Sequence, residues 1–525
     1  MKKQAAKRRK PARRKRTANA RTAGLSASDI GAIRRRLIES LIEDGGPEDH
    51  GLEEMVEELL AAGLDASDDM PDPEMLSEFG DALEEARINA NGGDPGARET
   101  LETVRAIIDK AARRDEIDPR MLMMLGQLFA AARLDIGDAA RASMARILKS
   151  AGGDGLKEDS FPSFLEPIRQ ASHEDPFETY DKFSSFIDIL PTGHKTAAVA
   201  ALAAGSDALG RRVAVGFLLH PDEHVALAAV RGLAGSDARG NLDPESRRRI
   251  RMIRDWLAPA RRDALDAVIP TAEAGAPRGA VKLLKTMASV CDGSGAANLY
   301  ATAKDGSRYL MTSLMTNKTG VVEALLFDDL PKDAVRSFEE TASSAAPTSE
   351  VSLPTFSRLV QLALGRNLAS GAPLPFALVR TLETLGLETL VPDLATPDEI
   401  IDSLLADVAG SDEAVRDRRA SPLDDDIARG WFEAGEEVDA ILDTADSPEE
   451  AAQALLESYL PRRRAFWASQ CALSALATKD RASRHEVWKT LALVGRDVLS
   501  DIPLDEIPLM RQIADTSALA YFMNG

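Results

Sequence analysis

The sequence contains very little cysteine, with only Cys291 and Cys471 in 525 residues. These two residues are far apart along the chain and form no CxxC pair. The sequence therefore excludes a disulfide framework and a cysteine-based zinc or redox motif. Such sparse use of cysteine favours a reducing compartment, and we expect the protein to be cytoplasmic.

Long apolar runs are missing as well. The longest, from Thr196 to Ala204, is mostly alanine and is much shorter than the roughly 20 residues that a membrane-spanning helix needs. The basic start of the chain lacks the apolar segment of a secretory signal, although its arginine and alanine content also fits an organellar transit peptide. We therefore expect no membrane partner.

Aromatic residues are scarce, at 5% of the chain, and alanine and leucine dominate the apolar set. Small and unbranched apolar side chains suit closely packed helices better than β-sandwiches, which large side chains usually fill. The composition therefore predicts a mainly α-helical protein, and its length is sufficient for several domains.

Acidic residues are absent from residues 1–22, which hold eleven lysines and arginines, including Arg8, Arg9, Arg13 and Arg14. Since the whole chain carries a formal charge of -21, the remainder carries -21 minus 11, or -32. We expect residues 1–24 to be a disordered basic tail. The acidic body would repel phosphate backbones, so any nucleic-acid contact would have to be local.

Helical periodicity begins just after this tail. Apolar residues recur at helical spacing between residues 28 and 41, at Ile30, Ile33, Leu37, Ile38 and Leu41. Further helices are predicted at 51–62, 73–89, 97–113, 119–133 and 137–150. Several helices open with a capping side chain followed by proline, as at Asp118-Pro119, Asp243-Pro244 and Ser447-Pro448.

Residues 297–328 depart from the helical pattern. Three runs, Leu299–Ala303, Ser307–Thr316 and Val321–Phe327, have strand character, and Asp305-Gly306 is a strong hairpin signal. We predict a three-stranded meander, with helices at 278–290 and 332–343 to cover its apolar face.

Residues 206–234 resemble one unit of a HEAT repeat. Leu209 to Leu219 forms one apolar helix face, and Val225 to Leu233 forms the next, with His220-Pro221-Asp222 in the turn between them. The resemblance implies two antiparallel helices within a curved solenoid that presents an extended surface to a partner. It implies no chemistry of its own.

The predicted fold is therefore mainly α: an irregular, HEAT-like helical-repeat array with a small α+β insert that contains the three-stranded meander. The predicted regions are a disordered basic tail (1–24), an N-terminal helical region (25–155), a HEAT-like helical region (156–275), the α+β insert (276–345) and a C-terminal helical region (346–525).

The strongest concentration of cations outside the tail lies in residues 247–262. Arg247, Arg251 and Arg254 share one helix face, and Arg261 and Arg262 follow. Together with the tail, these residues could grip phosphates or a protein partner. Alternatively, the arginines pair with neighbouring acids in a solvated face. Arg462-Arg463-Arg464, beside Phe466 and Trp467, has the same two interpretations.

Other motifs favour structural roles. His220-Pro221-Asp222-Glu223-His224 matches the HxxEH pattern of inverted zinc peptidases, but Pro221 indicates a break in the helix that this chemistry needs. Cys291 before Asp292-Gly293-Ser294-Gly295 is expected to be a buried thiol that ends a helix. Asp424-Asp425-Asp426 is typical of a solvated helix start. We expect no catalytic residue, cofactor or metal site.

The sequence favours a non-enzymatic interaction or scaffold protein that binds another macromolecule. The alternative is a nucleic-acid-associated protein that uses the tail and the strip from Arg247 to Arg262. An enzyme with a site around residues 278–343 stays open, although no nucleophile and base pair is apparent. The identity of the partner and the oligomeric state also stay open.

Overall fold

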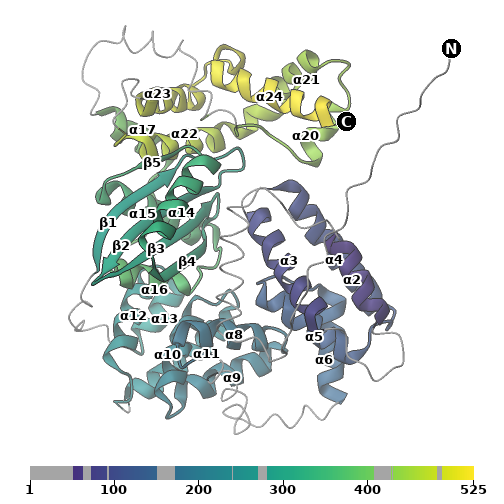
Figure 1. The fold of residues 1–525 in the computed structure, drawn as a ribbon, viewed down its shortest axis with the longest axis vertical. Coiled ribbons are helices and arrows are strands. Elements are labelled where there is room, and N and C mark those ends of the chain that lie inside the picture. The colour runs from purple at the N-terminus through teal and green to yellow at the C-terminus, as the bar shows by residue number, and fades with distance from the viewer. Residues whose placement is uncertain are drawn as a thin grey trace, which may run out of the picture.

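A computed structural model describes residues 51–62, 73–91, 94–150, 169, 172–238, 240–269, 281–406, 427, 430–481 and 487–524. Helices dominate this part of the chain, and one antiparallel sheet lies between two helical regions (Figure 1). The mainly α fold with a small α+β insert is thereby confirmed. Within the described residues, no helix is both long enough and apolar enough to cross a membrane.

Five helices form the N-terminal lobe: α2 (Leu52–Ala62), α3 (Pro73–Asn91), α4 (Pro95–Arg113), α5 (Pro119–Ala131) and α6 (Asp138–Ser150). All five were predicted from periodicity. Asp118 caps α5 by accepting hydrogen bonds from the backbone N–H groups of Arg120 and Met121. Phe79 and Phe129 are buried in the core of the lobe, with ring centroids 6.5 Å apart.

A second set of helices follows: α8 (Pro176–Asp188), α9 (Thr192–Ala204), α10 (Ala208–Gly216), the 3-10 turn η3 (Phe217–Leu219), α11 (Glu223–Ala238), α12 (Pro244–Arg254) and α13 (Pro259–Asp266). The two helices predicted for residues 206–234 are α10 and α11, joined by the predicted turn. Their resemblance to a HEAT repeat stays a prediction. Helix α11 also packs on α9, where small residues allow a close approach: a Cβ on Gly232 would lie 2.5 Å from that of Ala203.

The sheet has five antiparallel strands in the order β4-β3-β2-β1-β5. They are β1 (Lys282–Ser289), β2 (Ala297–Asp305), β3 (Arg308–Asn317), β4 (Gly320–Leu330) and β5 (Thr348–Glu350). The three predicted strands correspond to β2, β3 and β4, so the meander is confirmed. Gly306 forms the β2–β3 turn at φ +56°, a conformation that glycine adopts without strain.

The helix predicted at 278–290 is wrong, because residues 282–289 form strand β1 between β2 and β5. A register shift between Leu283 and Lys285 interrupts the pairing with β2. Such a bulge breaks the strict alternation of apolar and polar residues from which strands are recognised. The short strand β5 was also missed.

Helices cover both faces of the sheet (Figure 1). The helix predicted at 332–343 is α14 (Lys332–Ala345), and its Phe338 meets Tyr300 of β2 edge-on, with ring centroids 5.4 Å apart. Helices α15 (Leu353–Ser370) and α16 (Ala377–Leu385) both pack on β4. These contacts cross the predicted boundary at residue 345, and the proposed domain limits stay a prediction.

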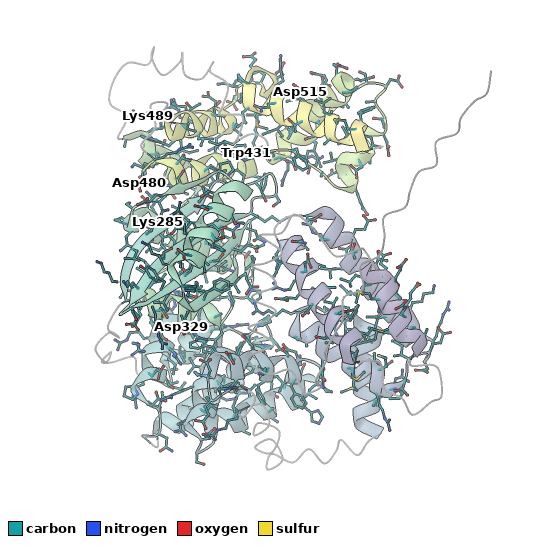
Figure 2. The ribbon with its side chains drawn as sticks, viewed as in Figure 1. Lys285, Asp329, Trp431, Asp480, Lys489 and Asp515 are labelled. Atoms are coloured by element: carbon teal, nitrogen blue, oxygen red, sulfur yellow. The ribbon has the colours of Figure 1, made fainter. Side chains whose placement is uncertain are left out.

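The C-terminal region is helical, as expected. It contains α17 (Pro397–Ala406), α20 (Glu436–Leu442), α21 (Pro448–Ala454), a π-helical turn η4 (Leu455–Tyr459), η5 (Leu460–Arg463), α22 (Arg464–Thr478), α23 (Val487–Leu499), η6 (Leu504–Glu506) and α24 (Pro508–Asn524). Trp431, labelled in Figure 2, links this region to the sheet by donating a hydrogen bond of 2.7 Å to the carbonyl of Cys291.

Three predictions fall outside the described residues. They are the disordered basic tail with Arg8, Arg9, Arg13 and Arg14, the helix at 28–41, and the helix start at Asp424-Asp425-Asp426.

Candidate macromolecule-binding surface

Helix α12 carries most of the arginine strip predicted from the sequence. Asp243 caps its start by accepting 3.0 Å hydrogen bonds from the N–H groups of Glu245 and Ser246. Ile250 and Ile253 are buried and fix the inward face of the helix. The cap and this apolar face decide which arginines turn outward.

Arg249 turns inward. Only 2% of its side chain is exposed, and its guanidinium pairs with Glu383 of α16 at 2.9 Å and with Glu245 at 2.6 Å. It also lies over the ring of Phe177, 4.5 Å from the centroid. Its neighbour Arg248 reaches Glu383 at 3.4 Å. These two cations connect α12 to α16 and are not available to a partner.

Two predicted surface arginines form ion pairs. Arg247 meets Asp237 at 2.5 Å, and Arg254 binds both carboxylate oxygens of Asp266, at 2.6 and 2.5 Å. Arg254 also contacts Asp255 at 2.7 Å. The hydrogen bond from Arg254 holds the pKa of Asp266 below its usual value. Carboxylates of aspartate residues thus lie beside the arginines on this face of α12.

The remaining arginines of the strip are half-buried. Arg261 donates hydrogen bonds to the carbonyls of His220 and Pro221, at 2.8 and 3.0 Å, and so ties α13 to the turn before α11. Arg262 donates to the carbonyls of Asp255 and Leu257. Arg251 lies on α12 between Arg247 and Arg254. The structure therefore gathers the predicted residues on α12 and α13, and their role in binding stays a prediction.

The second cluster, Arg462 to Arg464, is paired in a similar way. Arg462 meets Glu437 at 2.7 Å, and Arg463 meets the buried Glu433 at 2.8 Å while stacking over Phe466. Arg464 donates to the carbonyls of residues 498, 500 and 502. These contacts hold the C-terminal helices together.

His220 and His224 do not share a helix. His220 follows η3 and precedes α11, so the break that Pro221 indicated is present. Its Nε2 lies 3.1 Å from Asp188, and its Nδ1 accepts a hydrogen bond from the N–H of Asp222. Burial opposes ionisation of Asp188, but His220 and Lys195 outweigh it and hold the pKa of Asp188 below its usual value. One ring nitrogen of His220 thus stabilises the turn, and the other attaches it to α8.

Cys291 is buried, as predicted, but it follows strand β1 rather than a helix. Burial raises the pKa of its thiol to about 11. Its backbone N–H donates to Ser474 of α22 at 3.1 Å, and the following Asp292 caps its own loop by accepting hydrogen bonds from Ser294 and Ala296. A protonated, enclosed thiol of this kind is inert, and the loop serves as a structural corner.

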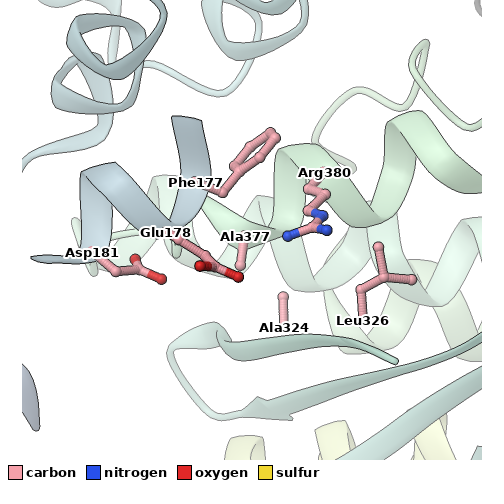
Figure 3. Close-up of a pocket in the computed structure, with 7 residues that line it drawn as sticks. All are labelled: Phe177, Glu178, Asp181, Ala324, Leu326, Ala377 and Arg380. Atoms are coloured by element: carbon pink, nitrogen blue, oxygen red, sulfur yellow. The ribbon is translucent and has the colours of Figure 1, made fainter. Parts of the chain in front are cut away.

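A small pocket lies between α8, β4 and α16 (Figure 3). Its lining consists of Phe177, Glu178, Asp181, Ala324, Leu326, Ala377 and Arg380. Its volume of about 10 Å³ accommodates one water molecule and no organic substrate. Arg380 pairs with Asp175 at 3.6 Å and with Asp328 at 3.8 Å, so carboxylates outside the pocket lining already bind this cation.

Sequence reasoning missed the acids that bind the buried arginines. Glu323 of β4 is buried and binds Arg87 of α3 at 2.7 Å and Arg133, just after α5, at 3.2 Å. This cluster attaches the N-terminal lobe to the sheet. One signal existed: Glu323 is a single acid inside the apolar run Val321–Phe327, and a charge placed there needs a buried partner. Nothing in the sequence pointed to Glu383.

Comparisons with known proteins relate both helical regions to one group. A family model described as "Y4lR second domain" matches residues 191–275, which contain α9 to α13. Another, described as "Y4lR C-terminal helical domain", matches residues 398–522, which run from α17 into α24. The two matched segments lie on either side of the sheet along the chain.

A relative extends the similarity across the sheet. "Uncharacterized protein y4lR" of Sinorhizobium fredii is 25% identical over 481 residues, which cover 87% of this chain and 90% of the relative. No solved structure matches the chain. The chain is thus similar to a Y4lR protein along most of its length, and the name of that relative assigns no activity.

Proposed function

We propose that this chain is a non-enzymatic helical-repeat protein that binds a protein partner through the surface formed by α10 to α13. The observation that carries the proposal is the helix pair α10 and α11, stacked between α9 and α12 and joined by the turn at His220 to Asp222. Stacked helix pairs of this kind bury their apolar stripes against each other and leave their outer faces for binding.

The charge pattern of this surface supports a protein partner rather than nucleic acid. Arg247 and Arg254 each lie against a carboxylate, and Asp255 and Asp266 stand among the cations. A phosphate backbone would meet these acids as well as the arginines, and the repulsion would offset much of the attraction. Alternating charges of this kind instead give specificity for a protein partner that carries the complementary charges.

A charge-exchange variant tests the proposal in the full-length chain. Replacing Arg254→Asp together with Asp266→Arg keeps the ion pair but reverses the pattern that a partner meets. The matched control exchanges Arg336→Glu and Glu340→Arg, an exposed pair on α14. We expect affinity capture from native lysate to retain a partner with the wild type and the control, and to lose it with the first exchange. Equal recovery with both exchanges would reject this surface as the binding site.

The second candidate is a nucleic-acid-associated protein that uses the tail. The observation in its favour is the eleven basic residues, without any acid, in residues 1–22. Counterion release predicts binding to generic DNA or RNA that weakens steeply with salt and disappears when residues 1–22 are deleted. Failure of the full-length chain to retain either nucleic acid at about 50 mM salt would dispose of this function.

A further inference from the structure

The C-terminal helix α24 ends in an exposed apolar face. Leu519, Phe522 and Met523 are 51%, 38% and 82% exposed, and their spacing places them on one side of the helix. Earlier in the same helix, the exposed positions Arg511 and Asp515 are charged, as is usual for a solvated face. We call Leu519, Phe522 and Met523 the α24 patch. Clustered apolar side chains of this kind mark interaction sites.

The helices that pack against α24 are rich in acidic residues. Helices α20 and α21 pack against α24 in the C-terminal lobe, where Figure 2 labels Asp515 (Figures 1 and 2). Residues 433–457, which include both helices, hold nine acids and no lysine or arginine. The hydroxyl of Tyr521, beside the patch, donates a hydrogen bond to Asp443. That bond and the nearby charge of Asp439 raise the pKa of Tyr521, so carboxylates lie next to the patch.

Arginines of the described residues offset only part of this charge. Arg463 pairs with Glu433, and Arg462 pairs with Glu437. Glu436, Glu449 and Glu450 are exposed on α20 and α21. An occupant of this surface therefore needs an apolar helix face for the patch and an excess of positive charge for its surroundings.

The chain itself contains a segment with both properties. Residues 28–41 carry apolar side chains at helical spacing, and residues 1–22, directly before them, hold eleven basic residues and no acid. Both stretches lie outside the described residues. Residues 28–41 are themselves mixed in charge, with Arg34 to Arg36 beside Asp29 and Glu39, so their contribution is the apolar stripe. The basic residues before them supply the charge.

We propose that the N-terminal segment of this chain docks on its own C-terminal lobe, with residues 28–41 covering the α24 patch and residues 1–22 lying along the acidic α20 and α21. Tethering within one chain makes the local concentration high, so weak apolar and ionic contacts are sufficient. The ionic part weakens with salt, whereas the apolar part does not.

Photo-cross-linking in the full-length chain tests this docking. A benzophenone amino acid replaces Phe522 in the α24 patch, and in the matched control it replaces Leu284, an exposed apolar residue of β1. We expect mass spectrometry to find the position-522 cross-link within residues 26–43, and the control cross-link elsewhere. Mixing isotopically light and heavy protein distinguishes cross-links within one chain from cross-links between two copies. We expect both peptides of each cross-linked pair to carry the same isotope label, as a cross-link within one chain requires. Cross-links only to other segments, or only between copies, would overturn the proposal.

Two further variants probe the two contributions separately. Ile38→Asp should lower the cross-link yield about tenfold or more, because it removes one buried apolar side chain from the contact. Glu449→Lys with Glu450→Lys should lower the yield at about 50 mM salt and have less effect at about 1 M salt, where charges are screened. A yield unchanged by Ile38→Asp would contradict docking through residues 28–41. The proposed partner-binding surface on α10 to α13 does not depend on this result.

Discussion

Two helix interfaces of this protein are held together by different means. Helices α9 and α11, separated by one helix in the chain, meet through small residues, with Gly232 against Ala203. Helices α12 and α16, more than a hundred residues apart, meet through the buried pair of Arg249 and Glu383. Apolar side chains can pack against many different apolar neighbours, whereas a buried charge destabilises the fold unless its counterion lies beside it. At these two interfaces, close packing joins helices that are near in sequence, and a buried ion pair joins helices that are distant in sequence.

The largest expected effect comes from breaking the α12–α16 interface. Glu383→Ala removes the main carboxylate from Arg249 and one from Arg248, leaving buried positive charge. We expect a loss of about 3–5 kcal/mol in the free energy of unfolding, measured by urea denaturation. Glu340→Ala, on an exposed pair of α14, is the control and should change little.

A double variant sharpens the interpretation. Arg249→Met combined with Glu383→Leu removes both charges and fills the space with apolar atoms, so it should be more stable than Glu383→Ala alone. If the double variant were the less stable of the two, the interface would depend on the ion pair itself rather than on the absence of an unpaired charge.

The next largest effect concerns the attachment of the N-terminal lobe at Glu323. Burial opposes ionisation of the Glu323 carboxyl, but the charges of Arg133 and Arg87 outweigh the effect of burial and hold the pKa of Glu323 below its usual value. A carboxyl whose pKa is lower in the folded state stabilises the fold above the unfolded-state pKa of about 4.3, and this stability is lost as the pH falls through the folded-state pKa. Glu323→Gln should therefore cost about 3 kcal/mol at neutral pH.

The pH series distinguishes charge from packing at this position. The stability difference between wild type and Glu323→Gln, read from urea midpoints, should shrink as the pH falls below about 4.3. Glu340→Gln on the solvated α14 pair should show no comparable trend. A difference that stayed constant from neutral to acid pH would assign the effect of Glu323 to shape rather than to charge.

The contrast between the two interfaces also explains what the sequence could predict. The periodicity of α9 to α12 and the aspartate caps of α10 and α12 are local signals, and the small residues that join α9 to α11 are visible in the apolar pattern. The strands β2 to β4 were predictable because turn residues separate them. Strand β1 was mistaken for a helix because its bulge disturbs the alternation.

The candidate surface was less predictable than the fold. The helical spacing of Arg247, Arg251 and Arg254 fixes their common face, but it contains no information on which acids face them. Asp266 approaches Arg254 from α13, and Glu383 approaches Arg249 from α16. Such pairings arise only when separate helices pack. The same helix thus holds a buried connecting arginine and surface arginines that the sequence could not distinguish by their contacts.

The α9–α11 interface should respond moderately to overpacking. In Gly232→Ala the new methyl would lie 2.5 Å from the Cβ of Ala203 and 3.0 Å from the carbonyl oxygen of Ala200. The helices must separate slightly, and we expect a loss of about 1–3 kcal/mol by urea denaturation. Gly193→Ala, at the start of α9 with nothing within 4 Å, is the matched control and should cause no loss. Similar values for both variants would argue against close packing at Gly232.

The smallest effect is expected for the surface pair of Arg254 and Asp266. Although its geometry is bidentate, both side chains reach solvent, with 28% and 32% exposed, so water replaces most of what the pair provides. Asp266→Ala should change the free energy of unfolding by no more than about 1 kcal/mol, and that change should diminish in about 1 M salt. A loss as large as that of Glu383→Ala, insensitive to salt, would mean that Arg254 connects helices just as Arg249 does. The distinction between connecting and surface arginines on α12 would then disappear, and with it the charge pattern that favours a protein partner over nucleic acid.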